Sequence, residues 1–169
     1  MDFDNYVYDD SVESEQLNTL ILLDNVFAKK DLKAKPVFHI LGGTALAFHG
    51  FKAVVTIDID TANALPTHVK DVVEPFVSDN ASEVAILASG YKERLIPYKS
   101  EVFKHIEVYL LSIEDLVITK LGASRYKDVD DLTKNGLLKK CDYDKLFSII
   151  NTELDTQTAS TLLVKLSTL

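Results

Sequence analysis

Hydrophobic residues along this chain recur at two spacings, which alternate and predict an order of helices and strands. From Leu17 to Ala28 they recur every three or four residues, which is the spacing of a helix. We expect this helix to begin with Asp10 as its N-cap and Glu13 as the reciprocal acid. Runs of β-branched, aromatic and other apolar residues predict strands at 37–41, 54–60 and 106–111.

Helices dominate the second half of the chain. Ser112 and Asp115 form the start signal of a helix that runs through Leu121. The stretch 81–88 fits both a strand and a helix, because a short apolar run does not distinguish them. Further helices are expected at 44–49, 66–77, 128–138, 144–154 and 158–166. This order predicts an α/β fold with a helical C-terminal part.

Length and composition fit a single domain. The chain has 169 residues, 47% hydrophobic and 26% charged, which is enough to bury a core without disulfides. We expect one domain at 1–169, with an α/β core at 1–125 and C-terminal helices at 126–169. One cysteine, a start unlike a signal peptide and no apolar stretch of membrane-spanning length predict a cytoplasmic protein that does not enter the membrane.

The net charge of −8 is concentrated at the N-terminus. Residues 1–16 hold six of the 26 acidic residues and no Lys or Arg, so the remainder has 20 acidic and 18 basic residues. Overall charge therefore does not favour general nucleic-acid binding. We expect the acidic start to be a solvated terminus, with docking on a basic partner as the alternative. A lysine cluster is expected to be solvated rather than to bind RNA: Lys29, Lys30, Lys33 and Lys35.

A glycine pair follows the predicted strand 37–41. Gly42 and Gly43 end the strand and lead into a short helix. Glycine lets the backbone approach a phosphate closely, and the first turn of a helix presents N–H groups to it. The pair therefore indicates a candidate phosphate-binding turn.

Two carboxylates come next along the chain. Asp58 and Asp60 stand two residues apart in the predicted strand 54–60, so their side chains would share a face, with Ile57 and Ile59 anchoring the strand behind them. Adjacent carboxylates repel unless a cation lies between them, and such hard oxygen ligands suit Mg²⁺ bridging to phosphates. This pair therefore predicts a metal site.

Three segments together carry a resemblance to a known group of proteins. The segment LGGTALAFHGFKAVVTIDID resembles the signature of nucleotidyltransferase-fold proteins, especially minimal nucleotidyltransferases and AbiEii-type toxin nucleotidyltransferases. The segments GYKERL and LSIEDLVITKLGASRYKDVDDL resemble later blocks of the same group. The resemblance covers roughly residues 37–132 and implies a mixed sheet flanked by helices.

The resemblance implies a role for each matching residue. The glycine turn and the residue after it would bind the nucleotide phosphates: Gly42, Gly43 and Thr44. Asp58 and Asp60 would be catalytic and hold Mg²⁺ or Mn²⁺. Lys120 would be catalytic and contact the phosphates, and Asp128 would support the site, with Asp131 one turn further on.

The chain also departs from the group's pattern. Val54 stands where related proteins often carry an arginine, and Lys52 would replace it only if the strand extended that far. The third carboxylate of the fold is not evident; Glu93 is preferred over Glu83 and Glu107 because it lies in the matched segment GYKERL.

The function implied by the resemblance is metal-dependent transfer of a nucleoside monophosphate from a triphosphate to an acceptor hydroxyl. The acceptor would be RNA such as tRNA, a protein or a small molecule. A toxin of a toxin–antitoxin pair is also implied, with an antitoxin protein as partner. The alternative is a non-catalytic module that binds nucleotide or protein, which the missing arginine and the missing third acid favour.

Overall fold

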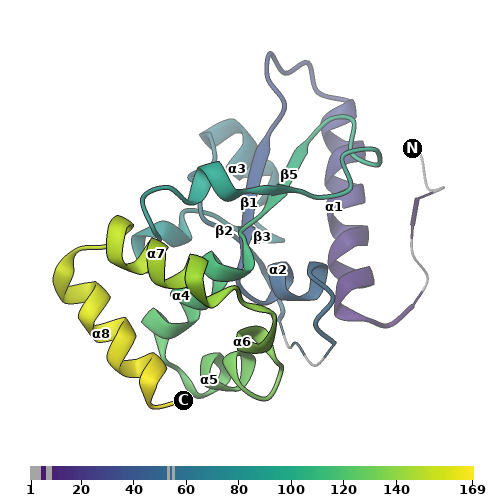
Figure 1. Ribbon diagram of the computed structural model, residues 1–169. Coiled ribbons are helices and arrows are strands. Elements are labelled where there is room, and N and C mark those ends of the chain that lie inside the picture. Colours follow the sequence, from purple (N-terminus) through teal and green to yellow (C-terminus); the bar gives the residue numbers. More distant parts are fainter. Residues whose placement is uncertain (1–4, 7–8, 53, 55) are drawn as a thin grey trace. The chain divides into compact units, whose positions relative to one another are not determined.

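The computed structural model describes residues 5–6, 9–52, 54 and 56–169, which form two compact units (Figure 1). The first unit comprises residues 1–81 and 96–110, and the second comprises 82–95 and 111–169. The chain thus leaves the first unit, returns to it for two strands, and then completes the second unit.

A mixed sheet of five strands lies in the first unit, as expected for the fold class. Its order is β3-β2-β1-β5-β4, with β1 parallel to β5 and antiparallel to β2. Strand β2 is parallel to β3, and β4 is antiparallel to β5. The strands are β1 (Val37–Leu41), β2 (Ile59–Thr61), β3 (Val77–Ser78), β4 (Ile96–Pro97) and β5 (Glu107–Leu110).

Three helices complete the first unit: α1 (Val12–Ala28), α2 (Gly42–Phe48) and α3 (Thr67–Val73). Helix α1 was predicted, but its N-cap is Ser11 and not Asp10. The Ser11 hydroxyl accepts a hydrogen bond from the Ser14 N–H, and Ser11 N–H itself donates to Asp9 Oδ1. Hydrogen bonds from Ser11 and Ser14 also lower the pKa of Asp9 to about 2. A serine hydroxyl therefore caps this helix, one residue later than expected.

The predicted strand 54–60 is wrong in its first half. Strand β2 begins only at Ile59, and Ile57 is 89% exposed instead of anchoring the strand. The Ile57 carbonyl accepts a hydrogen bond from Gln16 Nε2, and the Asp58 carbonyl accepts from Thr56 Oγ1. Because side chains satisfy these carbonyls, this part of the chain forms an irregular loop rather than a strand. Positions 53 and 55 lie outside the described residues.

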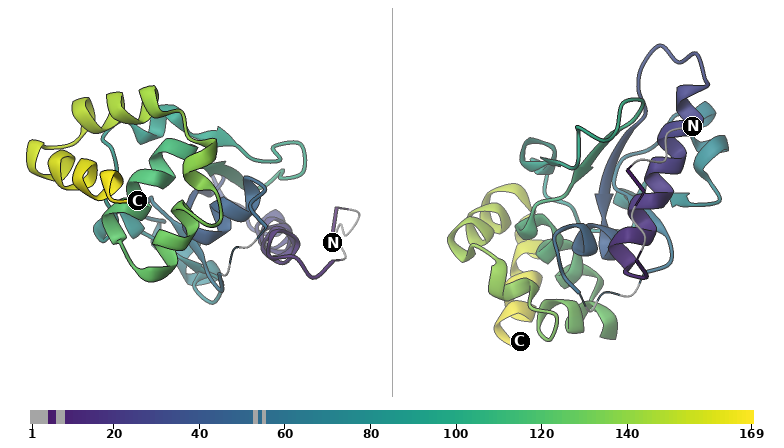
Figure 2. Two further views of the ribbon diagram at one scale, coloured as in Figure 1. Left: turned by 60° about the horizontal axis from the view of Figure 1, so that its bottom comes forward. Right: turned by 90° about the vertical axis from the view of Figure 1, so that its right-hand side faces the viewer.

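The second unit is helical. The Ser112 hydroxyl accepts from the Asp115 N–H and caps α4, as predicted. Helix α4 is its buried centre, with Leu116, Val117 and Ile118 fully inaccessible. Helices α7 and α8 lie side by side, in the yellow-green and yellow parts of Figures 1 and 2. The helices are α4 (Ile113–Ala123), α5 (Tyr126–Leu132), α6 (Leu137–Lys140), α7 (Tyr143–Glu153) and α8 (Thr156–Ser167), with short 3₁₀ turns η1 (Ala81–Glu83) and η2 (Tyr91–Arg94).

Two expectations for helices need correction. The predicted helix 128–138 is divided, because Gly136 takes a left-handed conformation with φ of 87° and separates α5 from α6. The predicted helix 66–77 ends at Val73, and Val77 belongs to strand β3. Across the described residues, the helices are all too short or too polar to cross a bilayer.

Candidate functional site

The glycine turn lies at the end of β1, where α2 begins. Gly42 has φ of 67°, a left-handed conformation that favours glycine. The register of the sheet places Asp60 opposite Leu41, the residue before this turn. A Cβ atom on Gly42 would lie 3.4 Å from Asp60 Oδ2. The Asp60 carboxylate, 18 positions further along the sequence, therefore lies where a side chain on Gly42 would touch it.

The loop before β2 is held against the start of α2 by hydroxyl groups. Thr44 Oγ1 and Thr56 Oγ1 both donate to the Asp58 carbonyl, at 3.2 and 3.1 Å. The Thr44 hydroxyl, predicted to bind phosphate, therefore positions the Asp58 backbone. Sequence reasoning missed Thr56, which no motif singles out.

Gly43 makes the closest approach in this region. A Cβ atom on Gly43 would lie 2.7 Å from the Thr56 Cβ atom, closer than carbon atoms can pack. Gly43→Ala is therefore expected to displace the loop and to destabilise the protein by about 1–3 kcal/mol, measured by urea unfolding. Adding Thr56→Gly removes the clash, so the double variant should lose less than the sum of the two single changes. Additive losses would contradict this contact.

The two candidate metal-binding acids differ in their surroundings. Asp58 is exposed and precedes β2, whereas Asp60 is half-buried within it. The strand-face argument for their proximity therefore does not apply to Asp58, and what brings Asp58 near the turn is the pair of hydroxyl contacts to its carbonyl.

Two carboxylates are enough for a magnesium site that substrate phosphates and water complete. Within the described ranges no group of three His, Cys, Asp or Glu side chains is arranged to hold a metal ion. Mg²⁺ commonly binds to one or two carboxylates together with substrate phosphates and water, and needs no all-protein cage. Asp58 and Asp60 are therefore compatible with a magnesium ion that arrives with a nucleotide.

The three glutamates considered as a third acid lie in different elements. Glu107 pairs with Val37 at the opposite end of β1 from Leu41, about 13 Å along the strand by its usual rise per residue. This separation excludes Glu107 from a site at Asp60. Glu93 and Glu83 are exposed residues of η2 and η1 in the second unit. The role of Glu93 stays a prediction.

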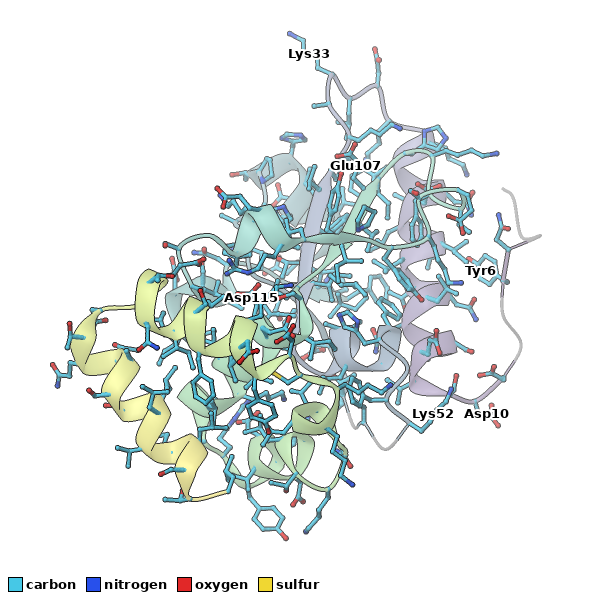
Figure 3. The ribbon with its side chains drawn as sticks, in the orientation of Figure 1. Tyr6, Asp10, Lys33, Lys52, Glu107 and Asp115 are labelled. Atoms are coloured by element: carbon cyan, nitrogen blue, oxygen red, sulfur yellow. The ribbon has the colours of Figure 1, made fainter. Side chains whose placement is uncertain are left out.

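The arginine that related proteins often carry at the position of Val54 is not replaced by Lys52 at β2. The Val54 side chain is buried, and Lys52 is exposed in the loop well before the strand begins. The Lys52 charge contributes to the lowered pKa of Asp9, after the stronger hydrogen bonds of that carboxylate. Figure 3 correspondingly shows Lys52 beside Asp10, near the start of α1.

Lys120 occupies a buried cluster of charges in the second unit. Its side chain donates to Asp128 Oδ1 at 2.9 Å and to Asp131 Oδ2 at 2.7 Å, and only 4% of the residue is exposed. Burial raises the pKa of Asp128, but hydrogen bonds from Arg125 and Lys120 outweigh it, and the pKa is lowered overall. The lowered pKa keeps the Asp128 carboxylate ionised at neutral pH. Asp128 thus binds Lys120 directly, whereas contact of Lys120 with a nucleotide stays a prediction.

Lys120 also borders a pocket of the second unit. The pocket has a volume of about 240 Å³, with Lys165 as a second cation and largely aliphatic walls. Lys165 Nζ donates to the Leu121 carbonyl at 3.1 Å.

The segment GYKERL has a role that sequence reasoning did not identify. Arg94 donates twice to Asp115 and twice to Glu153, at 2.6 to 2.9 Å, so it joins η2 to α4 and α7. Gly90 N–H donates to Glu153 Oε2, and a Cβ on Gly90 would lie 2.9 Å from that atom. The glycine and the arginine of this segment thus bind the same carboxylate. The only sequence signal was their occurrence in a matched segment.

Comparison with known proteins identifies a family. The family model described as "Nucleotidyltransferase of unknown function (DUF6036)" matches residues 16–166, nearly the whole chain. No curated protein and no solved structure matches the sequence.

Proposed function

Because the chain belongs to this family of nucleotidyltransferases of unknown function, we propose that it moves a nucleoside monophosphate from a nucleoside triphosphate to an acceptor hydroxyl in a metal-dependent reaction. The observation that carries the proposal is the position of the Asp60 carboxylate, 3.4 Å from where a Cβ atom on Gly42 would lie. A phosphate at the turn would have a metal-binding carboxylate directly beside it.

Each candidate site residue of the first unit has a role in the proposed reaction. Gly42 and Gly43 keep the turn free of side chains, so that backbone N–H groups reach the phosphates. Asp58 and Asp60 would hold the metal, and the Asp58 backbone is fixed by the hydroxyl groups of Thr44 and Thr56. A bound Mg²⁺ or Mn²⁺ would supply charge neutralisation at the phosphates.

The reaction itself is a displacement at the α-phosphorus. The acceptor oxygen forms a bond to this phosphorus as its proton is lost to solvent, and the bond to the bridging oxygen breaks. Pyrophosphate carries away the electron pair of that bond. Catalysis of such a displacement rests mainly on positioning and charge stabilisation, which are the properties that a glycine turn and paired carboxylates provide.

The proposal also covers the acceptor of the transferred group and the biological role of the transfer. A hydroxyl of RNA such as tRNA, of a protein or of a small molecule would suit the chemistry. The resemblance to AbiEii-type toxins supports action as a toxin that is neutralised by an antitoxin protein. Expression of the chain alone should then stop bacterial growth, and expression of Asp60→Asn at equal level should not. Growth arrest by both would reject a toxin that depends on transfer.

A second candidate function is a module that binds nucleotide or protein without turnover. The buried Val54, in place of an arginine, and the presence of two rather than three clustered acids among the described residues favour it. In this alternative the metal–nucleotide complex binds but no group is transferred.

A thermal-shift and transfer experiment separates the two. Nucleoside triphosphate with Mg²⁺ is expected to raise the melting temperature, because binding at one hundred times Kd adds about 2.7 kcal/mol to stability. With EDTA the shift should vanish, as it should for Asp58→Asn combined with Asp60→Asn. Equal shifts with and without metal would reject the two-aspartate site. A metal-dependent shift with no transfer of α-³²P label to any component of a cell lysate would favour the binding module.

A further inference from the structure

An exposed surface of the second unit combines an aromatic ring with several cations. We call it the α5 surface, and it consists of Arg125, Tyr126, Lys127 and Lys134. Tyr126 is 78% exposed, although aromatic rings usually contribute most of their area to a protein core. Most of the Tyr126 ring therefore lies outside the core, where a ligand can reach it.

The charge of this surface is opposite to that of the chain as a whole. The α5 surface holds three cations, Arg125, Lys127 and Lys134, whereas the chain as a whole carries −8; the segment 120–140 around it contains three acids. Two of the three acids, Asp128 and Asp131, are buried; both pair with Lys120, and Asp128 also pairs with Arg125. Asp130 is the partly exposed acid of the segment and pairs with Lys134 at 2.9 Å. The exposed charges are therefore mostly positive.

The Tyr126 ring and the Lys134 ammonium group are in contact with each other. Lys134 Nζ lies 5.4 Å from the centre of the Tyr126 ring and 3.5 Å from its hydroxyl oxygen. This is a cation–π distance. Because Lys134 is also tethered to Asp130, it places a positive charge beside the ring and leaves much of the ring accessible.

Arg125 is anchored in a similar way. Its Nε atom donates to Asp128 Oδ2 at 2.8 Å, its backbone N–H donates to the same oxygen, and Nη2 donates to Asp128 Oδ1 at 3.4 Å. The side chain is nevertheless 74% exposed. Because these contacts restrain a guanidinium that is still largely exposed, Arg125 has little conformational freedom to lose on binding. The buried Asp128 therefore orients an exposed cation.

We propose that the α5 surface binds single-stranded nucleic acid, with a base stacked on Tyr126 and the flanking phosphates bound by Arg125, Lys127 and Lys134. Exposed aromatic rings among cations are the means by which single strands are bound without sequence preference. An acidic protein would use the cations but has no need of the ring. The further statement that this nucleic acid is the acceptor of transfer rests on the proposed function; the binding does not.

Fluorescence anisotropy tests this with a short labelled single-stranded RNA of mixed sequence, the single-stranded DNA of the same sequence, and the RNA duplex. The full chain is used in EDTA without nucleoside triphosphate, so failure of the proposed transferase site cannot affect the outcome. Both single strands should bind more tightly than the duplex. Tyr126→Ala should weaken single-strand binding at least about fivefold, while Tyr126→Phe, which keeps the ring, should bind as the unchanged protein does.

A charge-matched pair of variants completes the experiment. Lys127→Ala with Lys134→Ala should lower the salt dependence of binding by about 1.4 in log K against log salt. Lys30→Ala with Lys33→Ala removes the same charge from the first unit and should change nothing. Equal effects of the two pairs, or no effect of Tyr126→Ala, would overturn the proposal. Loss of binding with the lysines but not with the ring would indicate a simple polyanion contact, as for an acidic protein, and would also overturn it.

Discussion

Asp60→Asn is expected to lower the rate of nucleotide transfer at least about a hundredfold, which corresponds to about 2.7 kcal/mol of activation free energy. Asparagine keeps the shape of the side chain beside Gly42 but removes the charge that would hold the metal. The free energy of unfolding should change much less than the rate, because asparagine preserves the volume of the side chain. Initial rates with radiolabelled triphosphate and the purified acceptor measure the first quantity, and urea unfolding measures the second.

Asp79→Asn is a suitable control for this variant, because Asp79 is a structural acid of the same unit. Its carboxylate accepts from the Leu65 N–H and pairs with Lys70, so it binds protein groups only. It should reduce stability modestly and leave the rate per folded molecule unchanged. If Asp60→Asn and Asp79→Asn lowered transfer equally, Asp60 would be structural rather than catalytic.

Lys120→Ala is expected to destabilise the protein by about 3–5 kcal/mol, because it leaves two buried carboxylates without their shared partner. The same change was expected from sequence to slow transfer. The buried position of Lys120 means that the free energy of unfolding must be measured first, by urea or thermal denaturation. Loss of transfer in this variant is informative only at a temperature where the variant remains folded.

Two further variants make the stability result specific to the buried cluster. Lys139→Ala removes an exposed lysine of the same unit and should change the free energy of unfolding by less than about 0.5 kcal/mol. Adding Asp131→Asn to Lys120→Ala should recover part of the lost stability, since one buried charge fewer is then uncompensated. A loss below about 1 kcal/mol for Lys120→Ala would show that the cluster contributes little to folding.

The order of elements could be predicted from sequence because it depends on local patterns. Helical spacing identified α1, the Ser112 cap identified the start of α4, and the apolar run identified β1 to the residue. The glycine pair and the two acids also stood out from short motifs. The fold class and the nucleotidyltransferase family followed from these same segments and are confirmed.

The tertiary structure decided the details of the site, because these depend on groups distant in sequence. An apolar alternation predicted a strand through Ile57, but hydrogen bonds from Gln16 and Thr56 turn that segment into a loop. Nothing in the sequence showed that Arg94 would join Asp115 to Glu153, or that Lys120 would be buried between two acids. The spacing of residues along the chain predicts on which face of its own helix or strand a side chain lies. The partner that satisfies a buried charge or carbonyl comes from another element, and only the folded chain brings the two together.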